Sequence, residues 1–300
     1  MGNYSIKELE KLSGIKAHTI RIWEKRYGVV QPSRTNTNIR YYTDADLRKI
    51  INVALLNNHG VKISKIAGLS VEELNRRVQE LTDEQPEASA HIDQLVVSMI
   101  SLEEEQFDKA LSHLVLRYGI EYTMTEVVYP FLHKIGVLWQ TGNITPAQEH
   151  FVSNLIRQKI IVAIDALPLA NKGAKSAVLF LPEFELHEIG LLFHYYIVKK
   201  AGLKTYYLGQ MVPLSDVHKI CEDHNPNFLI TSITTAPAPK DVQDLLTNLC
   251  AKQPGRQVLV TGPVVQKMAL RLPSNLHMFH SSQELRLLLA NLNVSLNKIG

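Results

Sequence analysis

The sequence predicts a multidomain protein of the α and α/β classes, built from three parts in succession. Near the start, two short helical segments are joined by a glycine-containing turn and followed by a hairpin. From residue 88 to residue 167 apolar residues recur with the helical period, and from residue 176 onward strands and helices alternate. A chain of 300 residues has room for about two or three such domains. We place three domains and one linker, at residues 1–81, 82–90 (the linker), 91–170 and 175–300.

Composition and charge narrow the class of protein. Hydrophobic residues make up 45% of the chain and charged residues 20%, which predicts folded cores. The two cysteines, Cys221 and Cys250, match no zinc or redox spacing and predict a reducing, cytoplasmic location. No apolar run approaches the roughly 18 residues of a membrane span. Residues 1–80 carry a net charge of +6 and residues 81–300 a net charge of −3, so the head is predicted to meet a polyanion.

The first segment has the pattern of a helix-turn-helix. Ser5 and Glu8 form a capping box at the start of a short helix, and Ser13-Gly14-Ile15 is a tight turn. A second helix is predicted from about His18 to Tyr27. In a helix-turn-helix this second helix enters the major groove of DNA, so the segment predicts a DNA-binding head.

The second helix and the hairpin offer cations on one side. Thr19, Arg21 and Arg26 are placed to reach phosphates or base edges, whereas Ile20 and Trp23 are predicted to face the core. Residues 30–34 and 40–42 read as the two strands of a wing with more cations and an aromatic pair. The alternative is a basic helical face that is merely solvated.

Three segments of the head, Tyr4–Leu9, Ile20–Tyr27 and Arg40–Tyr42, resemble the winged helix-turn-helix of MerR-family transcription regulators. The resemblance covers about residues 1–75. It implies a DNA-contacting surface made of Thr19, Arg21, Arg26, Tyr27, Arg34, Arg40 and Tyr41. Further helices are predicted at Thr43–Asn58 and Ser70–Leu81. No sustained heptads follow residue 70, so dimerisation is predicted to come from the body and not from a long coiled coil.

Four amphipathic stripes between residues 88 and 167 predict a small four-helix bundle. Their apolar positions are Ile92, Leu95, Val96 and Met99; Phe107, Ala110, Leu111, Leu114 and Val115; Val127, Val128, Phe131, Leu132 and Ile135; and Phe151, Leu155, Ile156 and Ile160. Gly136, Gly142 and Pro146 interrupt the pattern close to Trp139, Glu149 and His150. Taken singly, Trp139 reads as a core tryptophan, and Glu149 and His150 as a solvated helix start.

The alternation after residue 176 predicts a doubly wound parallel sheet of the flavodoxin-like, or Rossmann-like, kind. Strands are predicted at 176–181, 203–208, 227–232, 257–261 and 276–279, and helices near 188–201, 214–224, 239–252, 264–271 and 282–292. No GxGxxG or P-loop pattern follows a strand, so a nucleotide fingerprint is absent. The loops predicted at the carboxyl edge, where such sheets bind ligands, are Glu185–Gly190, Gly209-Gln210, Ser232–Thr235 and Thr261–Pro263.

His187 is the residue of this edge with the most specific chemistry. Neutral imidazole is a common metal ligand, and a carboxylate two residues earlier, Glu185, can fix the tautomer of the ring. The plain alternative is an ordinary loop histidine.

The edge as a whole resembles the cobalamin-binding Rossmann-like domain, whose pattern is Asp-x-His-x-x-Gly, then Ser-x-Leu, then Gly-Gly. The resemblance implies that His187 is the lower cobalt ligand with Glu185 as its partner. It also implies a slot for the cofactor's nucleotide tail, lined by Gly190, Ser232, Thr234 and Gly262. The chain departs from the pattern with Glu185 for Asp, Thr234 for Leu and Thr261-Gly262 for Gly-Gly, which implies a tighter slot or lower affinity.

The chain has a tryptophan, Trp139, followed after nine residues by Glu149-His150. This arrangement resembles that of the photoreceptor regulators of the CarH/LitR type, which combine the same three parts in the same order. The resemblance implies that the bundle caps the upper face of the cofactor and that these three residues surround the adenosyl group of adenosylcobalamin there. It further implies a repressor that binds operator DNA as a homotetramer in the dark and dissociates when light cleaves the cobalt–carbon bond. Gln140 stands where some members have a histidine that binds cobalt after illumination, so this chain departs from those members.

Three functions therefore remain open at this point. The first is the light-dependent, adenosylcobalamin-binding regulator. The second is a regulator of the same fold that has lost cobalamin and is controlled by a protein partner or another ligand. The third is a corrinoid enzyme, such as a methyl carrier or mutase subunit. The DNA-binding head and the lack of a substrate domain argue against the third, so a protein without enzymatic activity is predicted.

Overall fold

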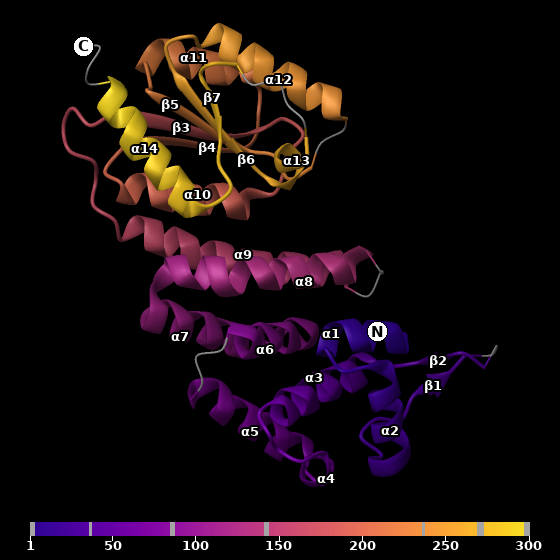
Figure 1. Cartoon of the computed structure of the whole chain (residues 1–300). Helices are drawn as coiled ribbons and strands as arrows, with labels where there is room; N and C mark the ends of the chain where they lie inside the picture. Colours follow the sequence, from indigo (N-terminus) through magenta and orange to yellow (C-terminus); the bar gives the residue numbers. More distant parts are fainter. Residues whose placement is uncertain are drawn as a thin grey trace. The chain divides into compact units, whose positions relative to one another are not determined.

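The computed structural model describes residues 4–35, 38–84, 88–140, 144–235, 238–268 and 273–296. The chain forms two compact units, Met1–Ile156 and Arg157–Gly300, and the boundary falls inside one helix (Figure 1). Within the described residues no helix is long and apolar enough to cross a membrane. The predicted fold class is confirmed, whereas the finer domain boundaries stay predictions.

The helix-turn-helix is formed by α1 (Ile6–Ser13) and α2 (Ala17–Tyr27). Ser5 and Glu8 make the predicted capping box, and Gly14 ends α1 in the left-handed conformation with φ of 71°. Ile20 and Trp23 of α2 are buried, as predicted. The opposite face of α2 is therefore the one that stays available for DNA.

The wing is a two-stranded antiparallel hairpin of β1 (Ser33–Arg34) and β2 (Arg40–Tyr41). Next to it, Tyr4 and Tyr42 exchange two backbone hydrogen bonds of 2.8 Å. Both side chains are fully buried, and their hydroxyls donate to Asp44 and Glu24 respectively. This pair fastens the start of the chain, the wing and α2 to one another.

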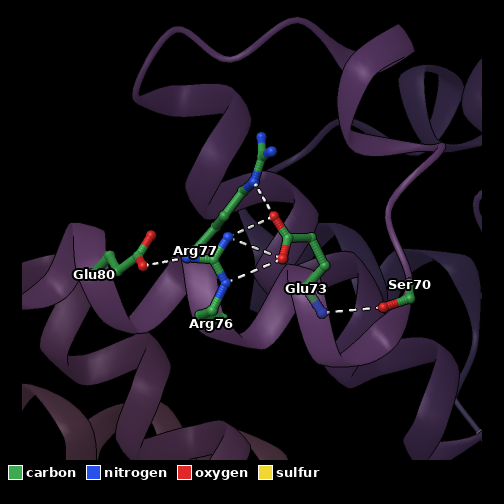
Figure 2. A network of polar contacts seen from close by, with 5 residues as sticks. All are labelled: Ser70, Glu73, Arg76, Arg77 and Glu80. Carbon is green, nitrogen blue, oxygen red and sulfur yellow. Dashed lines mark hydrogen bonds and ion pairs between the residues drawn. The ribbon is translucent and has the colours of Figure 1, made fainter.

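Three helices complete the head: α3 (Asp44–Asn58), α4 (Ile63–Ile66) and α5 (Val71–Glu84). Ser70 caps α5 as predicted, because its Oγ accepts a hydrogen bond of 3.1 Å from the backbone of Glu73. Arg76 and Arg77 both bind the carboxylate of Glu73, and Arg76 also reaches Glu80 (Figure 2). Hydrogen bonds from the two arginines lower the pKa of Glu73 to about 2. The network lies at the surface, so it orders side chains more than it stabilises the fold.

The helical bundle follows the predicted stripes. Its elements are α6 (Ala88–Ser101), α7 (Glu104–Tyr122), the π-helix η1 (Thr123–Val128), α8 (Tyr129–Gln140) and α9 (Pro146–Asp165). Leu95, Phe107, Val127 and Phe131 are fully buried, and the rings of Phe107 and Phe131 lie 5.7 Å apart. A kink at Gly119 and the wide turns of η1 precede α8, and a 3.6-residue period does not predict either feature.

The second unit contains the predicted parallel sheet, with strand order β4-β3-β5-β6-β7. The strands are β3 (Ser176–Pro182), β4 (Lys204–Val212), β5 (Phe228–Ser232), β6 (Gln257–Thr261) and β7 (Leu276–Met278). The helices are α10 (Glu188–Lys200), α11 (Leu214–His224), α12 (Pro239–Lys252), α13 (Pro263–Gln266) and α14 (Ser282–Leu296). Helices α10 and α14 cover one face of the sheet, and α11 and α12 cover the other (Figure 1). This strand order is that of flavodoxin-like proteins.

The predicted loop at Gly209-Gln210 is wrong, because β4 continues through these residues to Val212. The pairing of β3 with β4 shifts register twice, after Leu179 and after Phe180. Gly209 and Met211 take up the irregularity with φ of 79° and 53°. An edge strand tolerates such bulges because only one of its sides is paired.

A buried histidine on α10 makes the stability of this unit depend on pH. His194 is 8% exposed, and its ring meets that of Phe279 edge-on with centroids 5.0 Å apart. Burial lowers the pKa of His194 from 6.5 to about 4. Protonation therefore favours the unfolded state, so the stability that His194 contributes is present above pH 6.5 and lost as the pH falls towards 4.

We expect His194→Leu to flatten this part of the pH profile. Hydrogen exchange of α10 should accelerate in the wild type as the pH falls from 6.5 to 4, after correction for intrinsic rates, and accelerate less in the variant. Exposed His280 gives the matched control, His280→Leu, which should follow the wild type. Parallel profiles for all three proteins would contradict the assignment.

Candidate functional site

The carboxyl edge of the sheet has one topological switch point, between β3 and β5. These strands are neighbours, yet β3 leads into α10 on one face and β5 leads towards α12 on the other. Ligands of open α/β sheets bind in the crevice that such a divergence leaves. The segments that follow these two strands contain Glu185–Gly190 and Ser232–Thr235, and the hydrogen bonds of Glu185 bring these two predicted segments together.

Glu185 joins the two loops through hydrogen bonds. Its carboxylate is fully buried, and Oε2 accepts from the backbone N–H groups of Thr234 (2.6 Å) and Thr235 (2.8 Å). Oε1 accepts from the backbone of His187 (2.9 Å) and lies 2.6 Å from Nδ1 of the same histidine. One side chain of the β3 loop therefore holds both the β5 loop and the imidazole.

The charge of Glu185 follows from these contacts. Burial raises the pKa of this carboxyl group. Hydrogen bonds from the His187 ring and from the backbone of Thr235, His187 and Thr234 lower the pKa by more than burial raises it, so that the net value is about 2. An ionised carboxylate only accepts hydrogen bonds, so Nδ1 of His187 carries the proton between them. In the neutral ring, Nε2 then holds the lone pair that a metal ligand needs. The side chain of His187 is 58% exposed, which leaves room for a ligand at the ring.

Two glycines of the same region lie close to residues at the end of β5. A Cβ added at Gly262, where φ is 119°, would lie 2.2 Å from the carbonyl oxygen of Ile233. A Cβ added at Gly190 would lie 4.0 Å from Oγ of Ser232. Gly262 therefore lets two loops pack backbone to backbone, and the oriented His187 fits a cofactor that offers a metal to the ring.

Thr234 has a role that the sequence did not indicate. Its backbone N–H donates to Glu185, while its side chain is half-buried. The position was predicted only as a wall of the tail slot. Because every residue except proline offers this N–H, Thr234 satisfies the contact as well as leucine would.

A second buried carboxylate, Glu188, was missed by sequence reasoning. It is 8% exposed, accepts a hydrogen bond of 2.8 Å from the hydroxyl of Tyr207 and pairs with Nε of Arg157 at 2.9 Å. The ring of Tyr207 stacks on that of Tyr195 with centroids 5.0 Å apart. Glu188, the residue after His187, is thus bonded to β4 through Tyr207 and to α9 through Arg157. The position of Glu188 within the predicted loop Glu185–Gly190 could have indicated a role at the site, but its partners come from distant parts of the sequence.

The predicted upper-face residues lie in the first unit. Nδ1 of His150 is 2.8 Å from Glu149, whose other oxygen accepts from Ser153 at 2.5 Å. The side chain of His150 is 72% exposed. The side chains of Trp139 and Gln140 lie outside the described residues, although both belong to α8. The roles of Trp139, Glu149 and His150 towards a cofactor therefore stay predictions.

The predicted DNA-contacting residues lie on α2 and the wing. Four arginines are exposed, at positions 21, 26, 34 and 40, and the three other residues, at positions 19, 27 and 41, are half-buried. The guanidinium of Arg26 lies 5.4 Å from the ring centroid of Tyr27. Arg34 donates to the side chain of Asn38 at 2.6 Å, within the wing. Each residue is accessible, and the contacts with DNA stay predictions.

Comparison with known proteins decides the family. The model of the MerR HTH family regulatory proteins matches residues 4–72, and a B12 binding domain model matches residues 91–163, which is the helical bundle. The HTH-type transcriptional repressor CarH of Myxococcus xanthus is 30% identical over 254 residues, covering 82% of this chain and 84% of CarH. The chain belongs to the MerR-family transcriptional regulators with a B12-binding domain. This confirms the predicted DNA-binding head and cobalamin-type body.

Two further proteins are similar to this MerR-family regulator. The repressor CarA of Myxococcus xanthus is 29% identical over 243 residues, covering 80% of each chain. The monomethylamine corrinoid protein of Methanosarcina barkeri superposes with a TM-score of 0.53 at 15% identity, covering 71% of this chain and 99% of that protein. The second likeness shows a shared fold and nothing more.

We expect Gly262→Ala to destabilise the second unit. Both the positive φ and the clash with the backbone of Ile233 oppose a side chain, so the free energy of unfolding should fall by about 1–3 kcal/mol. Hydrogen exchange of β5 and β6 measures this. Gly255→Ala is the matched control, because a Cβ there meets nothing within 4 Å. Equal exchange in the two variants would contradict the close approach.

Proposed function

We propose that this regulator is a light-responsive transcriptional repressor that binds adenosylcobalamin. In the dark it assembles on operator DNA, and light that cleaves the cobalt–carbon bond releases it. The observation that carries the proposal is His187, oriented by the buried carboxylate of Glu185 at the switch point of the sheet, in a chain with a MerR head. CarH and CarA, which are transcriptional repressors, support the direction of regulation.

The residues of the second unit divide the binding of the cofactor. Nε2 of His187 would bind the cobalt, and Glu185 holds the ring in the tautomer that leaves Nε2 unprotonated and raises its basicity. Gly190, Ser232, Thr234 and Gly262 line the slot for the nucleotide tail. When bound, adenosylcobalamin supplies a cobalt–carbon bond that visible light breaks.

Helix α9 connects the upper-face residues with this site. Trp139, Glu149 and His150 surround the adenosyl group in this proposal, and the last two lie in the first turns of α9. Arg157 lies two turns further along the same side of the helix, since residues four apart are neighbours on a helix surface. Through its ion pair with Glu188, Arg157 joins α9 to the residue that follows His187. In this proposal the ion pair passes a movement of α9 on to the loop of His187.

Assembly converts weak DNA contacts into tight ones. The contacts come from Thr19, Arg21, Arg26, Tyr27, Arg34, Arg40 and Tyr41. A homotetramer in the dark presents several such heads at once, and linked binding can raise avidity by about 10²–10⁴ without a new contact. Dissociation in the light removes this gain, and the single heads leave the operator.

A second candidate is a regulator that does not bind cobalamin and answers to a protein partner or another ligand. It is favoured by Thr234 and Thr261, which stand where the cobalamin-binding pattern has leucine and glycine. Both candidates keep the DNA-binding head, so the cofactor is the feature that separates them.

We expect purified protein, loaded with adenosylcobalamin in the dark, to show a bound-cobalamin spectrum and a large mass that falls after green light. His187→Ala should lose the histidine-ligated spectrum, and Glu185→Gln should weaken cobalamin binding by about 10–100-fold. Absorption spectroscopy and light-scattering chromatography measure these effects, and exposed His280→Ala is the control.

Each other outcome has a distinct meaning. Absence of binding by the wild type would support the second candidate. Bound cobalamin with an unchanged mass would reject oligomer switching but keep the cofactor.

We further expect Arg157→Gln to keep the cobalamin spectrum and weaken the response to light. Loss of the ion pair with Glu188 uncouples α9 from the loop of His187 but leaves the histidine and its carboxylate in place. The fall in mass after illumination should shrink relative to the wild type. Lys172→Gln, at an exposed position of the second unit, is the control. A mass change equal to that of the wild type would reject the coupling.

A further inference from the structure

One residue on the exposed face of α2 does not fit the cationic character of that face. Within α2, which the structure describes in full, the exposed residues are His18, Arg21, Ile22, Lys25 and Arg26. Four are polar or cationic, whereas Ile22 is apolar and 51% exposed. Residues three and four apart adjoin on a helix, so Ile22 lies between His18 and Arg26 along one row, with Arg21 and Lys25 in the next.

Ile22 has no place in the core of the head. The core side of α2 is supplied by Ile20 and Trp23, which are 0% and 5% exposed. A branched apolar side chain in the middle of a cationic face gains nothing in water. The docking geometry of a helix-turn-helix places this face in the major groove of DNA.

The major groove offers an apolar side chain one matching group. Each base pair presents hydrogen-bond donors and acceptors there, and thymine adds its C5-methyl group. We infer that Ile22 packs on a thymine methyl group and thereby specifies T at one position of each operator half-site. The inference rests on the DNA-binding head alone, and it holds whether or not cobalamin controls the protein.

The inference divides the work of α2 between two kinds of side chain. Arginine and lysine contacts with phosphate fix the register of the helix and carry no sequence information. They also make affinity depend steeply on salt. Contact between Ile22 and a methyl group is uncharged, so it adds base preference without changing the salt dependence.

The test removes the methyl group from the DNA and the isoleucine from the protein. Operator sequences are first selected from a random duplex library with the full-length chain, in the dark, with and without adenosylcobalamin. Each thymine of the selected site is then replaced singly by deoxyuridine, which lacks only the C5-methyl. At one position of each half-site we expect wild-type affinity to fall about fourfold, the value of one buried methyl-sized group.

Ile22→Ser should bind thymine and deoxyuridine equally at that position and keep the salt slope of the wild type. Ile39→Ser is the matched control, because Ile39 is an exposed isoleucine of the same head, 64% exposed on the wing. It should retain the difference between thymine and deoxyuridine. If Ile22→Ser binds no DNA, the deoxyuridine scan with wild-type protein still tests whether a thymine methyl group contributes to affinity. Selected sites without a fixed thymine, or an effect of deoxyuridine that is equal in wild type and Ile22→Ser, would overturn the inference.

Discussion

The second unit depends on a buried, ionised carboxylate. An uncompensated charge in the interior costs several kcal/mol or more, and a carboxyl group normally takes up a proton instead. Glu185 keeps its charge because the loops around it direct N–H groups at both oxygens. The charged group in turn joins the loop after β3 to the loop after β5, which lead to helices on opposite faces of the sheet. The orientation of His187, and with it any ligand chemistry at this edge, follows from that single group.

Most of the fold was predictable because its signals are local. The apolar runs of β3, β5 and β6 and the stripes of the bundle appear in the structure close to their predicted bounds. The capping box of α1 and the cap of α5 were also readable, since each involves residues only three apart. Features that depend on pairing between distant segments were not. The extension of β4 past Gly209 arises from register shifts against β3, and the π-helix η1 has no periodic signature.

The candidate site also contains local relationships, which the sequence shows, and distant ones, which it does not. Glu185 and His187 lie two residues apart, so the sequence displayed their relationship directly. The partners of Glu188, which are Tyr207 and Arg157, come from a neighbouring strand and from the preceding helix, and only the folded chain brings them together. Thr234 illustrates a different limit of the sequence. A pattern of side chains cannot reveal a contact made by the backbone, and it is the backbone N–H of Thr234 that holds Glu185.

Helix α9 belongs to both compact units, since the boundary falls between Ile156 and Arg157 while the helix continues from Pro146 to Asp165. Lys199 also donates to the carbonyl oxygen of Ile164 near the end of this helix. Residues along an unbroken helix keep a fixed rotation relative to one another about the helix axis. An insertion of one residue between His150 and Arg157 would turn these two side chains by about 100° relative to each other about the helix axis, so the length of α9 matters as much as the identity of its residues.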